Sequence, residues 1–202
     1  TSAINSDKTG TLTLNQMTVT KVWAGGHWYE VTGGGYSKEG TLLSVAGHDV
    51  PDFSRLGLGL VLASDATVSD DGEVAGDPTE AALVVLAAKL GVSADETRRA
   101  YPRVAEVPFD SAYKFMATFH DHPDGDGSLV QLVKGAPDVL LDRCSRVTRD
   151  GSAEPIDGRR SEVLESNGSS SMATVRPRPR DFASTAPSMR RLGVSTPMTK
   201  GE

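Results

Sequence analysis

The sequence predicts an α+β fold in which an antiparallel sheet is flanked by helices. Two segments of mixed apolar and polar residues, 19–24 and 27–32, are separated by Gly25-Gly26. A two-residue glycine loop supplies the positive φ angles that a tight hairpin needs. Elsewhere, apolar residues at helical spacing follow residues that cap helices well. Hairpins and capped helices within one chain indicate a mixed body with helices packed on a sheet.

The clearest helix begins at Asp77-Pro78-Thr79-Glu80. Asp77 can cap the first turn, Pro78 suits its first position, and Glu80 lies where a capping box places a carboxylate. Gly91 is a natural stop after Leu90. Similar signals predict further helices over 52–63, 93–101 and 137–144. Two glycines weaken the helical pattern in the segment 52–63.

Short apolar segments between these helices predict strands over 104–107, 113–120 and 129–133. In the second strand, alternation places Lys114, Met116 and Thr118 on one face. The residues after position 121 include Pro and Gly and therefore read as a loop.

Composition excludes several classes of protein. The 202 residues are 38% hydrophobic and 24% charged, which is typical of a globular chain. The net charge of -6 disfavours a general nucleic-acid surface, so no nucleic-acid partner is expected. The single cysteine, Cys144, excludes an internal disulfide framework and a cysteine-clustered zinc site. The longest apolar stretches, 56–63 and 81–88, are too short to cross a membrane, so this segment is not expected to insert directly.

The C-terminal segment 166–202 differs from the body. It is rich in Ser and Pro and contains Arg176-Pro177-Arg178-Pro179-Arg180. Its few large apolar side chains cannot offset the entropy of ordering, so the sequence predicts a disordered tail. A basic arm that binds an acidic partner is the alternative interpretation.

The strongest chemical signal is Asp7-Lys8-Thr9-Gly10-Thr11-Leu12-Thr13. A carboxylate at a strand end, followed by small polar residues and glycine, can act as nucleophile and metal ligand. Nearby N–H groups and hydroxyls can hold phosphate oxygens, and a hard cation such as Mg²⁺ can bridge the transferred charge. A lone Asp-x-Thr would be an ordinary strand-to-turn transition, but the full string is far more specific.

This string resembles the phosphorylation motif of P-type ATPases, the ATP-driven ion pumps of membranes. Three further segments resemble nucleotide-domain motifs of that family, in the family's order, and the resemblance runs from residue 2 to about residue 165. They are Gly76-Asp77-Pro78-Thr79-Glu80, Phe109-Asp110-Ser111 with Lys114, and Lys134-Gly135-Ala136-Pro137-Asp138. The pattern is closest to the calcium and sodium/potassium branch, and calcium is the first expectation for the ion.

The resemblance implies roles for individual residues. Asp7 would form the aspartyl phosphate, and its carboxylate and the Thr9 carbonyl would bind Mg²⁺. Phe109 would stack on adenine, and Glu80 would accept from its amino group. The cofactors implied are ATP and Mg²⁺, and the nucleotide site would comprise Thr9, Glu80, Phe109, Ser111, Lys114, Lys134 and Gly135. Without the resemblance, Glu80 could close a capping box, Phe109 could be core, and Lys134 could be a solvated strand end.

The implied organisation is a fragment of the phosphorylation domain at 1–17, a nucleotide-binding domain at 18–165 and the tail at 166–202. The partners would be ATP and the remainder of a membrane pump, with this segment facing the cytoplasm. The sequence contains no Gly-Asp-Gly-x-Asn-Asp segment, which binds Mg²⁺ in the family. We therefore expect the isolated chain to bind ATP without turnover. A soluble phosphohydrolase of the haloacid-dehalogenase type and a non-catalytic truncated nucleotide-binding product are the alternatives.

Overall fold

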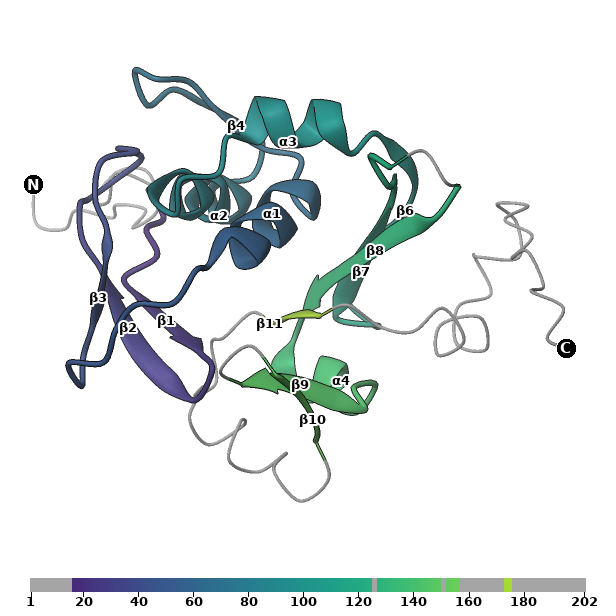
Figure 1. Ribbon diagram of the computed structural model, residues 1–202. Helices are drawn as coiled ribbons and strands as arrows, with labels where there is room; N and C mark the ends of the chain where they lie inside the picture. The colour runs from purple at the N-terminus through teal and green to yellow at the C-terminus, as the bar shows by residue number, and fades with distance from the viewer. Residues whose placement is uncertain (1–15, 125–126, 150–151, 157–172, 176–202) are drawn as a thin grey trace, which may run out of the picture.

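The computed structural model describes residues 16–124, 127–149, 152–156 and 173–175. Within them, antiparallel strands form four sheets, accompanied by four helices. Figure 1 shows a central pair of helices with a three-stranded sheet on one side and a longer, twisted sheet on the other. The α+β class is thus confirmed, with separate sheets in place of a single one.

The three-stranded sheet contains the predicted hairpin. Strands β1 (Lys21–Ala24) and β2 (His27–Val31) pair directly across a turn in which Gly25 and Gly26 have φ angles of 62° and 91°. Strand β3 (Leu42–Ser44) joins the other edge of β2. Tyr29 and Leu42 on this sheet are buried against the helices.

The central helices are α1 (Ser54–Leu62) and α2 (Pro78–Lys89). Asp77 caps α2 by accepting from the backbone N–H groups of Thr79 and Glu80, as predicted. Residues 81–87 of α2 are all buried, because one side packs on the three-stranded sheet and another on the segment after α1. Helix α3 (Ala94–Ala100) begins at the Ser93 cap.

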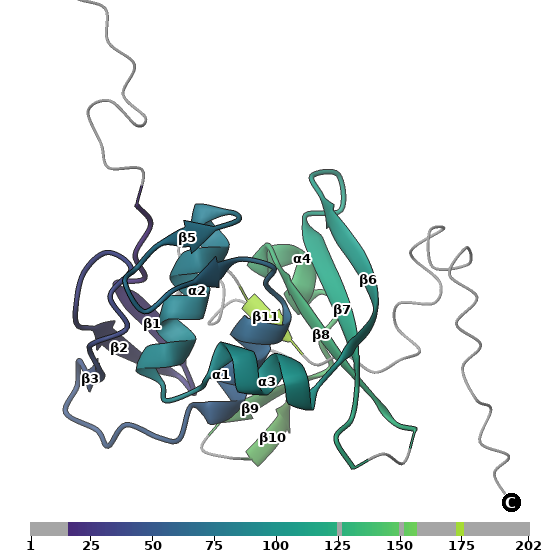
Figure 2. The ribbon, with the colours of Figure 1, turned by 90° about the horizontal axis from the view of Figure 1, so that it is seen from above.

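The second large sheet has the strand order β11-β8-β7-β6. Its bounds are β6 (Arg103–Asp110), β7 (Phe115–Asp121), β8 (Leu129–Gly135) and β11 (Ala173–Val175). Neighbouring residues along a strand point to opposite faces. Val130 and Leu132 pack with Leu62 of α1, and Val133 packs with Leu140 of helix α4, which spans Pro137–Leu141. The sheet is therefore covered on both faces, and the central helices approach it from one side (Figure 2).

The structure shortens one predicted helix and adds short strands that the sequence did not predict. Helix α4 (Pro137–Leu141) ends earlier than expected, and Cys144 packs with Ile156 beyond it. The additional strands are β3 with β4 (Thr67–Val68), β5 (Val74–Ala75), β9 (Arg146–Arg149), β10 (Ser152–Pro155) and β11. The prediction of a disordered tail did not include β11, which pairs with β8. The rest of residues 166–202 lies outside those that the structure describes.

Candidate functional site

The structure brings one group of the predicted site residues together. Glu80 lies in the first turn of α2, and Lys134 lies at the end of β8. Lys134 Nζ is 2.7 Å from Glu80 Oε1, and the two side chains are 8% and 17% exposed. Lys134 Nζ is also 3.3 Å from Ser64 Oγ. The ammonium therefore faces inward and bridges the sheet to the central helices, so the solvated-strand-end interpretation of Lys134 is wrong.

Glu80 does not reach back to its own helix cap. Its second oxygen, Oε2, accepts from the backbone N–H groups of Asp65 and Ala66 at 2.7 Å and 3.1 Å. These residues belong to the loop 63–66 between α1 and β4. Both carboxylate oxygens are thus held by donors at a nearly buried position.

A bulge places Phe109 in line with this ion pair. In β6, residues 108 and 109 lie between the register pairs Val107–Ala117 and Asp110–Phe115, so both stand opposite Met116. Met116 in turn pairs with Lys134 on β8. Phe109 is 63% exposed. An accessible aromatic face therefore lies across one strand from the buried lysine.

Ser111 and Lys114 lie in the exposed loop between β6 and β7. Lys114 has a φ angle of 57°, a left-handed conformation that non-glycine residues adopt rarely. Its N–H donates to Asp110 O at 2.7 Å, and its carbonyl accepts from Ala136 N at 2.9 Å. Its Nζ is 3.9 Å from Asp138 Oδ2, an exposed ion pair.

Gly135 allows this loop to approach β8 closely. A Cβ atom at Gly135 would lie 2.4 Å from Lys114 O and 2.6 Å from Phe115 Cβ. Real Cβ atoms do not come so near, so a side chain here would displace the loop that carries Lys114. Gly135 thus sets the distance between the two motif segments.

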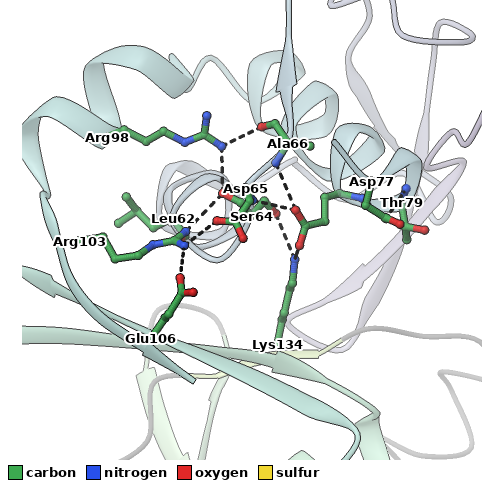
Figure 3. Close-up of polar contacts among 11 residues, drawn as sticks. Leu62, Ser64, Asp65, Ala66, Asp77, Thr79, Arg98, Arg103, Glu106 and Lys134 are labelled. Carbon is green, nitrogen blue, oxygen red and sulfur yellow. Dashed lines mark hydrogen bonds and ion pairs between the residues drawn. The ribbon is translucent and has the colours of Figure 1, made fainter. Parts of the chain in front are cut away.

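Sequence reasoning missed several residues of the polar cluster in Figure 3, among them Ser64, Arg98 and Arg103. Ser64 is fully buried. Arg98 Nη2 donates to the carbonyls of Ser64 and Ala66, both at 2.9 Å. Arg103 Nη1 pairs with Asp65 and Glu106 at 2.5 Å and 2.7 Å. They lie far from Lys134 in sequence and match none of the motifs, so only the fold identifies them.

The two arginines respond differently to their surroundings. Burial lowers the pKa of Arg98, and the positive charge of nearby Arg103 adds to this effect. Burial also opposes the charge of Arg103, but the hydrogen bonds that Arg103 donates to Asp65 and Glu106 raise its pKa above the usual value. Both remain charged at neutral pH, because a guanidinium does not lose its proton in proteins.

The predicted nucleophile and magnesium ligands, Asp7 and Thr9, lie outside the described residues. Among the residues that are described, no group of three or more His, Cys, Asp or Glu side chains gathers as a metal site. Nor does a helix within these ranges have the length and apolar content that crossing a membrane requires. The described part of the site is thus a buried ion pair flanked by an exposed aromatic ring and an exposed lysine.

Comparison with known proteins places this arrangement in a family. The family model described as "P-type ATPase, cytoplasmic domain N" matches residues 53–184. The match extends past position 165 into the segment for which the sequence predicts a tail. A cation-transporting ATPase of Synechocystis is 45% identical over 173 residues, covering 79% of this chain and 18% of that protein. A calcium-transporting ATPase of Bacillus subtilis is 40% identical over 172 residues, covering 81% and 19%.

A more distant relative, a sodium/potassium-transporting ATPase subunit alpha-1 of Oreochromis mossambicus, is 33% identical over 171 residues, covering 82% and 17%. The chain thus spans about a fifth of the length of the curated relatives that it matches. The matching family model covers more than half of this chain, and a cytoplasmic domain N agrees with the mixed α+β fold. The chain therefore belongs to the P-type ATPase family and contains its cytoplasmic domain N.

Proposed function

We propose that this chain is the ATP-binding portion of a pump that moves cations across a membrane. The observation that carries the proposal is the row Phe109, Met116, Lys134 across three strands, with Lys134 paired to Glu80. A purine needs an aromatic face for stacking and polar groups for its edge. Phe109 offers the first, and Glu80 and Lys134 offer the second. The comparison with cation-transporting ATPases supports the same assignment.

The residues present divide the nucleotide between them. The exposed ring of Phe109 stacks on the base, and Glu80 accepts from its amino group beside Lys134. Lys114 is 58% exposed and its Nζ lies 3.9 Å from Asp138. This loose pairing leaves its ammonium free to turn toward phosphate oxygens, with Ser111 in the same loop as a hydroxyl donor. Gly135 keeps that loop against β8.

The remaining chemistry belongs to the N-terminal motif. Asp7 is the proposed nucleophile, which forms an aspartyl phosphate, and Asp7 and Thr9 are the proposed Mg²⁺ ligands. Mg²⁺ would neutralise charge on the transferred phosphoryl group. Calcium is the proposed cargo, since one relative is named a calcium-transporting ATPase. In this proposal the whole pump lies in a membrane and the present segment faces the cytoplasm.

Substitution of the pocket residues tests the binding proposal. Lys134→Ala removes a charged hydrogen-bonding group, and Phe109→Ala removes the stacking face, so each is expected to weaken ATP binding by about 1–3 kcal/mol. Trp28→Ala, an exposed aromatic on β2, is the control for Phe109. Calorimetric titration with ATP gives the affinities, and circular dichroism checks the fold. Equal affinity in all four folded proteins would refute the assignment.

A second assay addresses the chemical step. We expect the isolated chain to bind ATP without turnover, because phosphoryl transfer requires rigid positioning and the sequence contains no Gly-Asp-Gly-x-Asn-Asp segment. The chain is incubated with γ-labelled ATP and Mg²⁺, quenched in acid and examined for hydroxylamine-sensitive label. Label that disappears in Asp7→Asn would mean that the chain is catalytically complete. Release of phosphate from simple phosphoesters would favour the soluble phosphohydrolase.

A further inference from the structure

We propose that Arg98 is a positioning residue for the nucleotide site, acting on Glu80 through the peptide group that joins Ser64 to Asp65. The proposal rests on the proposed function, since it concerns how the carboxylate that would read the base is held. Arg98 lies on α3 and touches neither Glu80 nor Lys134 in the contacts described above. Its hydrogen bonds therefore reach Glu80 only through the loop, while the charges of Arg98 and Glu80 also attract one another through space.

The geometry of one peptide group carries the argument. Arg98 Nη2 donates to Ser64 O at 2.9 Å, and Asp65 N donates to Glu80 Oε2 at 2.7 Å. This carbonyl and this N–H belong to the same peptide unit, which is planar and trans, so they point in opposite directions. A cation that fixes the carbonyl also fixes the direction of the N–H.

The two peptide groups that follow are each held at one end. The Asp65–Ala66 group donates its N–H to Glu80 Oε2 at 3.1 Å, and the carbonyl of the Ala66–Thr67 group accepts from the same Arg98 nitrogen at 2.9 Å. Ser64 and Ala66 are fully buried, so their polar groups depend on partners inside the protein. Figure 3 shows Arg98 joined by a dashed line to Ala66.

Electrostatics strengthen the same link. The guanidinium withdraws electron density from the Ser64 carbonyl, which makes the Asp65 N–H a stronger donor to the carboxylate. Glu80 Oε2 is thereby anchored, and Oε1 is left directed at Lys134 Nζ, 2.7 Å away. Without Arg98 the Ser64 carbonyl keeps only the longer contact from Arg103 Nη2, at 3.5 Å, so the loop peptides and the donors that orient the carboxylate are held less firmly.

Two measurements on the full chain test the inference. Arg98→Met keeps the aliphatic stem and removes the donors, so amide hydrogen exchange at Asp65 and Ala66 is expected to accelerate about tenfold or more, without any ligand. ATP affinity is expected to fall about tenfold, the scale of one hydrogen bond to a charged group. The matched control is Arg99→Met, whose guanidinium contacts only the Asp95 carbonyl of its own helix in the described contacts.

A double-mutant cycle separates positioning from general stability. If Arg98 acts through Glu80, Arg98→Met costs less than about threefold in ATP affinity once Glu80→Gln is present. A merely structural role would give the same loss in both backgrounds. Arg98→Gln, a milder change, is expected to act in the same direction and serves if the Met variant does not fold.

The outcomes distinguish the two proposals. If the unmodified chain binds no ATP, the proposed function fails, and the exchange rates alone decide whether Arg98 holds the donors to Glu80. If the chain binds ATP but folded Arg98 variants bind as tightly as Arg99→Met, the proposed function stands and the inference is overturned. Unchanged exchange at Asp65 and Ala66 would overturn it as well.

Discussion

Glu80 illustrates what sequence can and cannot say about a single residue. Its position three residues after Asp77 predicted a capping box, and the family resemblance predicted a nucleotide contact. In the structure only Asp77 acts as the cap. Glu80 turns to Asp65, Ala66 and Lys134, which are brought near it by the packing of a loop and a strand. Short-range patterns identify caps, whereas such long-range partners require the fold.

Gly135 gives a prediction at the same scale. Gly135→Ala places a methyl group against Lys114 O, so we expect a loss of about 1–3 kcal/mol in the free energy of unfolding. ATP affinity should fall too, because the Lys114 loop shifts. Urea unfolding measures the first effect. Gly34→Ala is the control, since a Cβ there meets nothing within 4 Å. Equal stability of the two variants would show that the close approach has no consequence.

At the scale of elements, the sequence predicted those with local signals. The hairpin followed from Gly25-Gly26, and α2 and α3 followed from their caps. Strands β4, β5, β9 and β10 were missed because two to four residues carry too little alternation to recognise. Strand β11 was missed because its pairing with β8 depends on a distant segment.

The Asp77 cap of α2 can be tested directly. Asp77→Ala leaves the N–H groups of Thr79 and Glu80 without their acceptor, so we expect a loss of about 1 kcal/mol in stability. Because Glu80 lies in the same turn, fraying of α2 should also weaken ATP binding. Chemical denaturation of this variant and of Asp71→Ala, an exposed turn residue, measures the difference. An unchanged midpoint with an unchanged slope would contradict the capping role.

For the whole molecule, the sequence indicated the α+β class, and the structure assigns its layers. Residues 81–87 of helix α2 are apolar on all sides. The sequence therefore offers no polar face from which the orientation of this helix could be predicted. The structure explains this composition, because α2 packs on the three-stranded sheet and on the segment after α1. The nearly buried Lys134–Glu80 pair joins the helical layer to the second sheet, so stability and the candidate site share residues.

His120 links stability of the whole molecule to pH. It is buried on β7 beside the Tyr101 carbonyl, 2.9 Å away, and burial lowers its pKa below 6.5. The unfolded chain therefore binds this proton more readily than the folded one. Above about pH 6.5 the histidine is neutral in both states and does not affect the free energy of unfolding. As the pH drops below that value, protonation in the unfolded chain lowers the stability of the folded protein. Urea midpoints from pH 7.5 to 5 should decline less in His120→Asn. An equal decline in both proteins would rule out His120 as the cause.

The central claim is that ATP binds along the row from Phe109 to Lys134, beside Glu80. The most direct measurement is a titration of the isotope-labelled chain with ATP, followed by amide chemical shifts. We predict saturable shifts concentrated in the first turn of α2, the loop after β6 and the end of β8, and their loss in Lys134→Ala. No saturable shifts, or shifts centred on the three-stranded sheet around Trp28 instead, would contradict the account.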